Sequence, residues 1–221
     1  MSLPVSLDED PQRRLGIVGA GKIGTAVARA AVAASYNVVI SGSGAADRIR
    51  LIVEVLAPGA HAATTEEVAH HADLIVLAVP MHSFRTLAHD LFAGKVVVDA
   101  MNYWEEIDGD DDELATAPAG TSVVVQKWFP SSKLVKSLNH LGYFKFGEGR
   151  RPRGASDRLA MAAAGNDSAA VAVVMDLIDR LGFDPVYAGS LDAGVALQPD
   201  GAVFGVSHSA DELAKLLAAE A

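Results

Sequence analysis

The chain has 221 residues, of which 50% are hydrophobic and 21% charged, enough to build one packed domain with an elaboration. Its formal charge of −10 argues against nucleic acid as a partner, because neutralising phosphates requires a net positive surface. The lack of cysteine excludes disulfides, thiolate nucleophiles and iron–sulfur clusters. No apolar run reaches the roughly 18 residues of a membrane span, and residues 1–12 do not resemble a signal peptide. We therefore expect a cytoplasmic protein without a membrane partner.

Strand-like and helix-like segments alternate through the first hundred residues. The predicted strands are residues 15–18, 37–40, a weak one near His61, 73–79 and 95–99. The predicted helices between them are residues 23–34, 47–56, 64–71 and 83–92. Residues 73–79 are almost wholly apolar, as expected of a parallel strand that is covered on both faces. The alternation predicts an α/β fold of the Rossmann type, with a doubly wound, mostly parallel sheet.

The second half of the chain is less regular. Further strands are predicted at residues 133–138, 159–164 and 184–187, and further helices at residues 123–128, 169–181 and from Ser209 onward. The acidic residues 108–113 are expected to form a solvated loop. We divide the chain into a flexible tail (1–12), a dinucleotide-binding Rossmann core (13–107) and an extension that continues the sheet, contributes the acceptor-binding side and ends in helices (108–221).

Three glycines follow the first predicted strand in the spacing G-x-G-x-x-G. Gly19 suits the tight turn, Gly21 lets a pyrophosphate approach the backbone, and Gly24 lets helix and strand pack closely. The helix that begins here adds free amides and the positive end of its dipole. An ordinary strand–helix turn is the alternative, but the position inside a strand–helix–strand unit favours a dinucleotide site. That site comprises Gly19, Ala20, Gly21, Lys22, Ile23 and Gly24.

The turn after the second predicted strand determines which dinucleotide is preferred. Sites for NAD usually place a carboxylate there, and residues 36–46 contain none. The chain instead offers hydrogen-bond donors and cations, which suit a 2′-phosphate: Ser41, Gly42, Ser43, Arg48 and Arg50. This pattern predicts NADP over NAD, although the two arginines are also compatible with ordinary surface positions.

Four further segments follow the glycine motif in a fixed order: Ser41-Gly42-Ser43, Leu77-Ala78-Val79-Pro80, Asp99-Ala100-Met101-Asn102 and Lys136-Ser137-Leu138-Asn139-His140. As an ordered set covering about residues 14–206, they resemble the NADP-dependent oxidoreductases of the deazaflavin type. In that family NADPH reduces an 8-hydroxy-5-deazaflavin coenzyme (factor 420), or the reverse. The resemblance implies NADP as the cofactor and the deazaflavin coenzyme as co-substrate. Members often carry arginine directly after the serine of the second-strand turn, where this chain has Gly44, and Arg48 follows one helical turn later.

Ligands of an open parallel sheet bind across the carboxyl ends of its strands. The resemblance implies that Val79, Pro80 and Ala100 line the nicotinamide ribose, and that Asn102, Asn139 and His140 face the acceptor ring. We add His82 and Ser137 to the cofactor-binding residues and Met101 to the substrate-binding ones, because they belong to segments at the same edge. Hydride transfer between two flat rings requires stacking rather than a strong general base, so we assign no catalytic acid. The histidine spacing predicts no metal site.

Residues 127–158 carry eight basic side chains against two acidic ones. Such a basic segment on an acidic protein suggests a ligand with an anionic tail, which matches the phosphodiester and glutamates of the deazaflavin coenzyme. The alternative is that the arginines pair with neighbouring acids or with a partner subunit. We expect a small-molecule electron acceptor with an anionic tail, and a homodimer.

Two other functions stay open at this point. One is a related NADPH-dependent reductase that uses flavin or ferric chelate, and the other is an NADP-binding sensor without turnover. A reductase of imines or carbonyl compounds is disfavoured, because only about 100 residues follow Asn102, too few for the helical domain that usually closes over such substrates.

Overall fold

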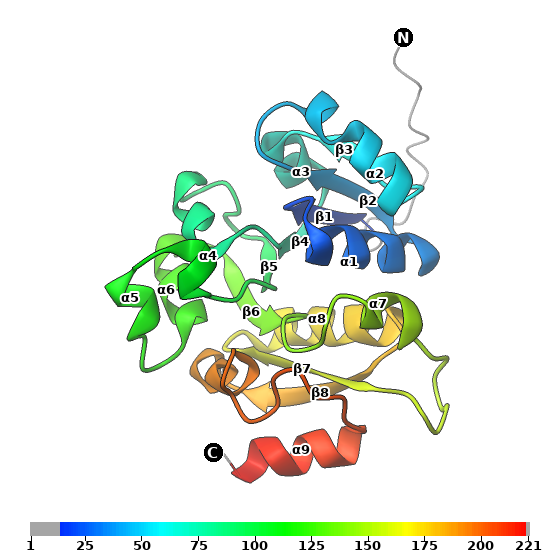
Figure 1. The fold of residues 1–221 in the computed structure, drawn as a ribbon, viewed down its shortest axis with the longest axis vertical. Coiled ribbons are helices and arrows are strands. Elements are labelled where there is room, and N and C mark those ends of the chain that lie inside the picture. Colours follow the sequence, from blue (N-terminus) through cyan, green and yellow to red (C-terminus); the bar gives the residue numbers. More distant parts are fainter. Residues whose placement is uncertain (1–13, 220–221) are drawn as a thin grey trace.

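The computed structural model describes residues 14–219, so the predicted tail, residues 1–12, lies outside the described part of the chain. These residues form one eight-stranded sheet in the order β3-β2-β1-β4-β5-β6-β7-β8 (Figure 1). Its strands are β1 (Arg14–Val18), β2 (Asn37–Ser41), β3 (His61–Ala63), β4 (Leu74–Leu77), β5 (Val96–Asp99), β6 (Lys133–Ser137), β7 (Ala160–Gly165) and β8 (Asp184–Gly189). Neighbouring strands run parallel except β6 and β7. The predicted Rossmann-type fold, with strands and helices added after the core, is therefore confirmed.

Helices connect the strands and cover the sheet. The α-helices are α1 (Lys22–Ala33), α2 (Arg50–Leu56), α3 (Thr65–His71), α4 (Glu105–Asp108), α5 (Asp112–Ala115), α6 (Thr121–Trp128), α7 (Lys145–Glu148), α8 (Ser168–Arg180) and α9 (Ala210–Ala219). Three 3-10 segments join them, η2 (Ala46–Arg48), η3 (Met81–Thr86) and η4 (Leu191–Leu197). None of the helices between residues 14 and 219 combines the length and apolarity needed to cross a bilayer.

Both faces of the sheet are buried, which explains the continuous apolar sequence of β4. Its residues alternate between two hydrophobic cores: Leu74 and Val76 pack with α1 and α8, whereas Ile75 and Leu77 pack with α3, α6 and η3. A third, smaller core lies under α9, which packs along β7 and β8 at the end of the sheet (Figure 1). The amino-terminal half and the later strands thus share one continuous sheet.

Helix starts agree with the sequence where a capping box is present. Thr64 accepts from the backbone N of Glu67 at 3.2 Å, and the Glu67 carboxylate accepts from the backbone N of Thr64 at 2.8 Å. Ser209 and Glu212 make the same reciprocal pair at the start of α9. Both signals are local, which is why they could be recognised in the sequence.

The predicted helix at residues 83–92 is wrong. Only η3 forms, and the chain then turns away to meet Trp128 at the end of α6. The Trp128 indole N–H donates to the Leu87 carbonyl at 3.0 Å, and the His89 ring lies 3.9 Å from the Trp128 ring between centroids. These tertiary contacts outweigh the helical preference of the segment.

The acidic residues 108–113 are only partly the solvated loop that the sequence predicted. Gly109, Asp110, Asp112 and Glu113 are exposed, but α4 ends and α5 begins within the segment. The Asp108 carboxylate accepts from the backbone N and the Nδ1 of His82, both at 3.0 Å. Arg85 pairs with Asp111 at 2.5 Å and with Glu113 at 2.6 Å. The segment is therefore fastened to η3, which follows the carboxyl end of β4.

Candidate functional site

The glycine turn between β1 and α1 needs glycine at two of its three positions for steric reasons. Gly19 has φ +119°, and a Cβ there would lie 2.3 Å from the Ala78 carbonyl oxygen. A Cβ on Gly24 would lie 1.8 Å from the Gly19 carbonyl oxygen. Gly21 differs, because a Cβ there would meet nothing within 4 Å. The backbone at Gly21 is thus open to whatever approaches the turn.

The amino end of α1 is prepared for an anion. Gly21 is its N-cap residue, so no side chain satisfies the first amides, and the first turn contains no acidic residue. Unpaired amides and the positive end of the dipole therefore face the open side of the turn. The Lys22 side chain leaves this region and lies over the Tyr143 ring, 5.5 Å from its centroid, while Ile23 packs against the core.

A cavity of about 600 Å³ adjoins this turn. Seven predicted cofactor residues line it: Gly19, Ala20, Gly21, Gly42, Ser43, Val79 and Pro80. Eight residues outside the predicted set complete the lining: Val18, Gly44, Ile49, Thr65, Ala78, Ser83, Thr86 and Leu87. Ser83 and Thr86 lie just beyond the carboxyl end of β4, a position that could have indicated them, whereas Thr65 comes from α3 and had no signal in the sequence.

In the turn after β2, the Arg48 side chain lies beside Gly44. Gly44 has φ +85°, and a Cβ there would lie 3.3 Å from Nη1 of Arg48. The Arg48 side chain therefore already covers the space beside Gly44. Arg50 pairs with Asp47 at 3.0 Å, whereas Arg48 has no ion-pair partner within residues 14–219.

Ser41 does not behave as predicted. Its side chain is fully buried, and its hydroxyl oxygen accepts from the Thr65 hydroxyl at 3.2 Å. As the last residue of β2, it turns its side chain toward α3, so the exposed hydroxyl of the turn belongs to Ser43.

Asn102 and Asn139, which follow β5 and β6, lie together at the carboxyl edge of the sheet. The Asn139 Nδ2 donates to Oδ1 of Asn102 at 2.9 Å and to the Leu197 carbonyl at 2.6 Å. Asn102 Nδ2 in turn donates to the Asn139 carbonyl at 3.1 Å. The structure thus brings together two of the four predicted acceptor-binding residues, and the pair is fastened to η4 through Leu197.

The other two predicted acceptor-binding residues, Met101 and His140, are buried, and so is most of Asn139. Of the four, only Asn102 is partly exposed, because the Met101 side chain packs into the core with α6. Ala100 is also buried, so its contribution to the edge is its backbone.

His140 and the predicted cofactor residue Ser137 hold β7 rather than face a ligand. The His140 Nε2 accepts from the backbone N of Ala162 at 3.0 Å, and the Ser137 hydroxyl donates to the Ala162 carbonyl at 2.7 Å. Burial, with smaller contributions from His208 and Lys136, lowers the pKa of His140 to about 4. His140 is therefore neutral, and an acceptor at Nε2, at neutral pH. The antiparallel β6–β7 pairing, which the sequence did not reveal, produces these contacts.

His82 remains at the surface, where Asp108 fixes its ring, and half of its side chain is exposed. It is the second residue of η3, next to the lining residue Ser83, but does not itself line the cavity.

A buried ion pair lies beneath this edge and was not predicted. Lys136 Nζ lies 3.4 Å from Oδ2 of Asp99, and both side chains are fully buried. Oδ2 of Asp99 also accepts from the Ser122 hydroxyl of α6 at 2.6 Å. Burial lowers the pKa of the Lys136 ammonium, and the charge of Asp99 opposes that change. The available signal in the sequence was Asp99, the charged residue at the end of the otherwise apolar strand β5.

The arginines of residues 150–158 lie at the carboxyl end of α8. Arg150 Nε donates to the Leu181 carbonyl at 2.8 Å, and Arg158 donates to the Asp179 carbonyl at 2.6 Å. Arg151 pairs with Asp157, and Arg158 also pairs with Asp184. Cations are favourable at this end of a helix. These contacts favour the second interpretation of the basic segment, in which its arginines pair with neighbouring groups.

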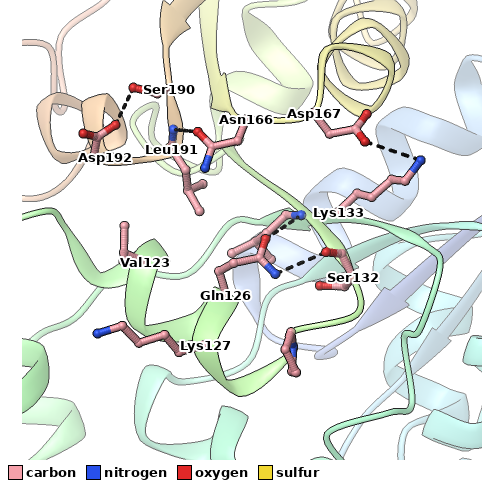
Figure 2. A pocket seen from close by; sticks show the side chains of 12 residues that line it. Val123, Gln126, Lys127, Ser132, Lys133, Asn166, Asp167, Ser190, Leu191 and Asp192 are labelled. Carbon is pink, nitrogen blue, oxygen red and sulfur yellow. Dashed lines mark hydrogen bonds and ion pairs between the residues drawn. The ribbon is translucent and has the colours of Figure 1, made fainter.

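A larger cavity of about 890 Å³ lies near the amino end of β6, beyond α6 and the start of α8 (Figure 2). It contains none of the predicted site residues. Most of its polar side chains contact one another or the backbone: Gln126 with Ser132 and Leu134, Lys133 with Asp167, and Asn166 with Leu191 (Figure 2). Parallel sheets bind ligands at the opposite edge, so the cavity at the glycine turn is the candidate site. Across residues 14–219, no group of three histidine or acidic side chains is arranged to hold a metal ion.

Residues 14–103 match the family described as NADP oxidoreductase, coenzyme F420-dependent. This part of the chain carries that family's sequence pattern. The predicted resemblance is therefore confirmed, and the match ends just after Asn102, at the carboxyl edge of β5. Residues 14–103 are thus similar in sequence to NAD(P)-dependent oxidoreductases, and the described chain shares the Rossmann-type fold of such enzymes.

Solved structures extend the likeness to most of the chain. Hypothetical protein SMa0349 of Sinorhizobium meliloti is 26% identical, with a TM-score of 0.76 over 89% of this chain and 95% of that one. A candidate F420-dependent NADP reductase of Arthrobacter sp. FB24 is 25% identical, with a TM-score of 0.67 over 84% of this chain and 88% of that one. The Escherichia coli K12 protein YjhV is 48% identical over 50 residues, which is 23% of this chain and 36% of YjhV. The chain thus matches only about a third of that relative's length.

Proposed function

We propose that this protein is an NADPH-dependent oxidoreductase that transfers a hydride between NADPH and a deazaflavin coenzyme of the F420 class. The observation that carries the proposal is the glycine turn, in which Gly21 is open and the amides of α1 are uncapped. The family match over residues 14–103 supports the same conclusion. In the forward direction NADPH, the oxidised deazaflavin and one proton yield NADP⁺ and the reduced deazaflavin. The nicotinamide supplies the hydride, and the chain binds and orients both rings.

The cofactor residues divide by the part of NADPH that they suit. The amides at the start of α1 suit the diphosphate, and Ser43 with Arg48 suits the 2′-phosphate. The wall formed by Val79, Pro80 and the hydroxyls of Ser83 and Thr86 leads from the glycine turn toward the carboxyl ends of β4 and β5, where the nicotinamide ribose would lie. Within residues 14–219, the residues that line the cavity include no histidine, lysine or carboxylate, which agrees with a hydride transfer between stacked rings.

Replacing Arg48 by alanine tests the preference for NADP. We expect the Kd for NADPH to rise about tenfold or more, since a charge-assisted contact to phosphate contributes about 1.5–3 kcal/mol, while the Kd for NADH stays unchanged. Arg50→Ala is the matched control, because Arg50 lies on the same segment but pairs with Asp47. Titration of both nucleotides by calorimetry provides the measurement. If both substitutions raise the Kd for NADPH equally, a specific role for Arg48 is excluded.

An aromatic pair after β6 offers a surface for the acceptor. Tyr143 and Phe144 are 43% and 50% exposed, and their rings meet edge to face with centroids 6.1 Å apart. Lys22 lies over the first ring and Lys145 over the second, 5.4 Å from its centroid, and neither lysine has an ion-pair partner in the described chain. Flat faces beside unpaired cations suit a planar heterocycle with an anionic tail. Tyr143 and Phe144 follow Asn139 in the segment after β6, so this surface continues from the carboxyl edge of the sheet, and Lys22 connects it to the amino end of α1.

Phe144→Ala is expected to raise the KM for the deazaflavin about three- to tenfold, because one aromatic contact contributes about 0.5–1.5 kcal/mol, with the Kd for NADPH unchanged. Tyr187→Ala is the control, since Tyr187 is an equally exposed aromatic residue on β8, in the extension of the sheet. Steady-state kinetics with varied deazaflavin measures the effect. An unchanged KM in the Phe144 variant would show that the acceptor binds elsewhere.

Turnover with a panel of acceptors decides between the remaining functions. Oxidation of NADPH is followed spectrophotometrically with the deazaflavin coenzyme, flavin mononucleotide and a ferric chelate. We expect the deazaflavin to be the best acceptor by kcat/KM. Faster turnover with flavin or ferric chelate would support the related reductase instead. NADPH binding without turnover of any acceptor would support a sensor.

A further inference from the structure

The buried ion pair makes hydrogen bonds to both the backbone N–H and the backbone carbonyl of Met101. The backbone N–H of Met101 donates to Oδ1 of Asp99 at 3.0 Å, and its carbonyl accepts from Lys136 Nζ at 2.5 Å. Asp99 and Lys136 are direct neighbours in the parallel register of β5 and β6. One ion pair therefore fixes both the backbone N–H and the backbone carbonyl of Met101.

Stability alone does not account for such a pair. Removing two charges from water costs as much as their attraction returns, so buried ion pairs are often replaceable by apolar side chains without loss of stability. Here the desolvation is complete, because both side chains have no exposed area. Oδ2 of Asp99 also accepts from the Ser122 hydroxyl. The backbone of η4 lies close to the Lys136 side chain, since a Cβ on Gly194 would lie 3.1 Å from its Cβ and Cγ. The surroundings thus hold the pair in one geometry.

The contacts continue from the buried pair to the surface. Met101 is followed by Asn102, whose amide pairs with Asn139, and Asn139 is in turn fastened to the Leu197 carbonyl of η4. These residues end β5 and β6 at the edge where the proposed function puts the nicotinamide and the acceptor.

We propose that Asp99 and Lys136 are positioning residues that hold the backbone from Ala100 to Asn102 in the geometry that aligns the nicotinamide for hydride transfer. This inference rests on the proposed function. The pair would act on the nicotinamide half of the cofactor only, because the adenosine half would bind at the glycine turn between β1 and α1 and at Arg48 of η2. Loss of the pair should therefore weaken the binding of the nicotinamide half without weakening that of the adenosine half.

The test is Lys136→Met, which keeps the length of the buried stem and removes its charge. We compare the Kd of NADPH with that of 2′,5′-ADP, which contains only the adenosine half with its 2′-phosphate. In the wild type NADPH should bind more tightly than the fragment. In the variant we expect the Kd of 2′,5′-ADP to stay within about twofold, the advantage of NADPH over it to fall at least about fivefold, and kcat to fall with it.

Lys95→Met is the matched control. Lys95 precedes the opposite, amino end of β5, where it pairs with Asp73 at 3.2 Å and donates to the Ala72 carbonyl at 3.0 Å. It should leave the ratio of the two affinities unchanged. If Lys136→Met does not fold, Gly194→Ala is the second variant, because its added Cβ pushes on the Lys136 stem without altering any charge.

Two results would overturn the inference in distinguishable ways. If the wild type binds both ligands and the variant weakens both alike, or weakens neither, the positioning role is wrong and the proposed function stands. If the wild type binds neither NADPH nor 2′,5′-ADP, the proposed function itself is wrong, and the positioning role is rejected with it.

Discussion

Replacing Gly21 by alanine is expected to weaken NADPH binding about tenfold or more while leaving the fold intact. A Cβ at this position meets no protein atom within 4 Å, so the free energy of unfolding should change by less than about 1 kcal/mol. The same methyl group would stand where the diphosphate must approach the amides of α1. Thermal unfolding and calorimetric titration of NADPH on the same sample measure the two effects.

Gly24→Ala is the comparison for Gly21→Ala, because a Cβ at Gly24 should disrupt the fold of the turn as well as NADPH binding. Its Cβ would lie 1.8 Å from the Gly19 carbonyl oxygen, so the turn must open, and we expect a loss of about 3 kcal/mol or more in stability together with weaker binding. A Gly21→Ala protein that binds NADPH as tightly as the wild type would refute the proposed diphosphate site. If instead Gly21→Ala is as unstable as Gly24→Ala, the open geometry of the turn is wrong.

Stability is expected to fall by about 3 kcal/mol as the pH is lowered from 7 to 4 because of His140 alone. Burial lowers the pKa of this residue from its ordinary value of 6.5 to about 4. Between these values the unfolded chain binds a proton at position 140 and the folded chain does not, so lowering the pH favours unfolding by about 1.4 kcal/mol per pH unit. The contribution is fully present above pH 6.5 and lost progressively below it. Urea unfolding at several pH values measures it.

His140→Gln should remove most of this pH dependence, since an amide oxygen can accept from the backbone N of Ala162 without titrating. His70→Gln is the control, because His70 is an exposed residue of α3. Unperturbed carboxyl groups titrate near pH 4, so the difference between wild type and variant at each pH, rather than the slope of either protein alone, gives the contribution of the histidine. A wild type whose stability is flat between pH 7 and pH 4 would contradict the buried, neutral state of His140.

These expectations share one physical feature of the site. The groups that would bind the adenosine half are open or exposed, as at Gly21, Ser43 and Arg48, whereas most of those under the nicotinamide end are buried and tied to neighbouring strands. Substitutions in the first group should change affinity with little loss of stability. Those in the second should change stability, alignment or both, and each experiment above therefore measures more than one quantity.

The sequence alone determined the features that depend on neighbours along the chain. The glycine spacing at residues 19–24, the apolar run of β4 and the two capping boxes each reflect backbone geometry within a few residues. They identified the Rossmann-type fold, the family resemblance and the open turn at Gly21. The sequence also suggested that Arg48 takes the place of the arginine that family members often carry at position 44, because one helical turn separates the two positions.

Only the tertiary structure decided where side chains point and what they contact. Contacts with Trp128 accompany the loss of the predicted helix beyond η3, and Arg85 ties the acidic segment to η3, although most of that segment stays exposed. The antiparallel β6–β7 pairing buried His140 and Ser137, and the neighbouring register of β5 and β6 joined Asp99 to Lys136. All of these contacts link residues more than 20 positions apart, and a single sequence carries no local signal for a partner at such a distance. The chain's own pattern therefore specified the open turn at which we propose that the diphosphate binds, whereas the packing of strands specified the buried contacts beneath the edge at which we propose that the two rings react.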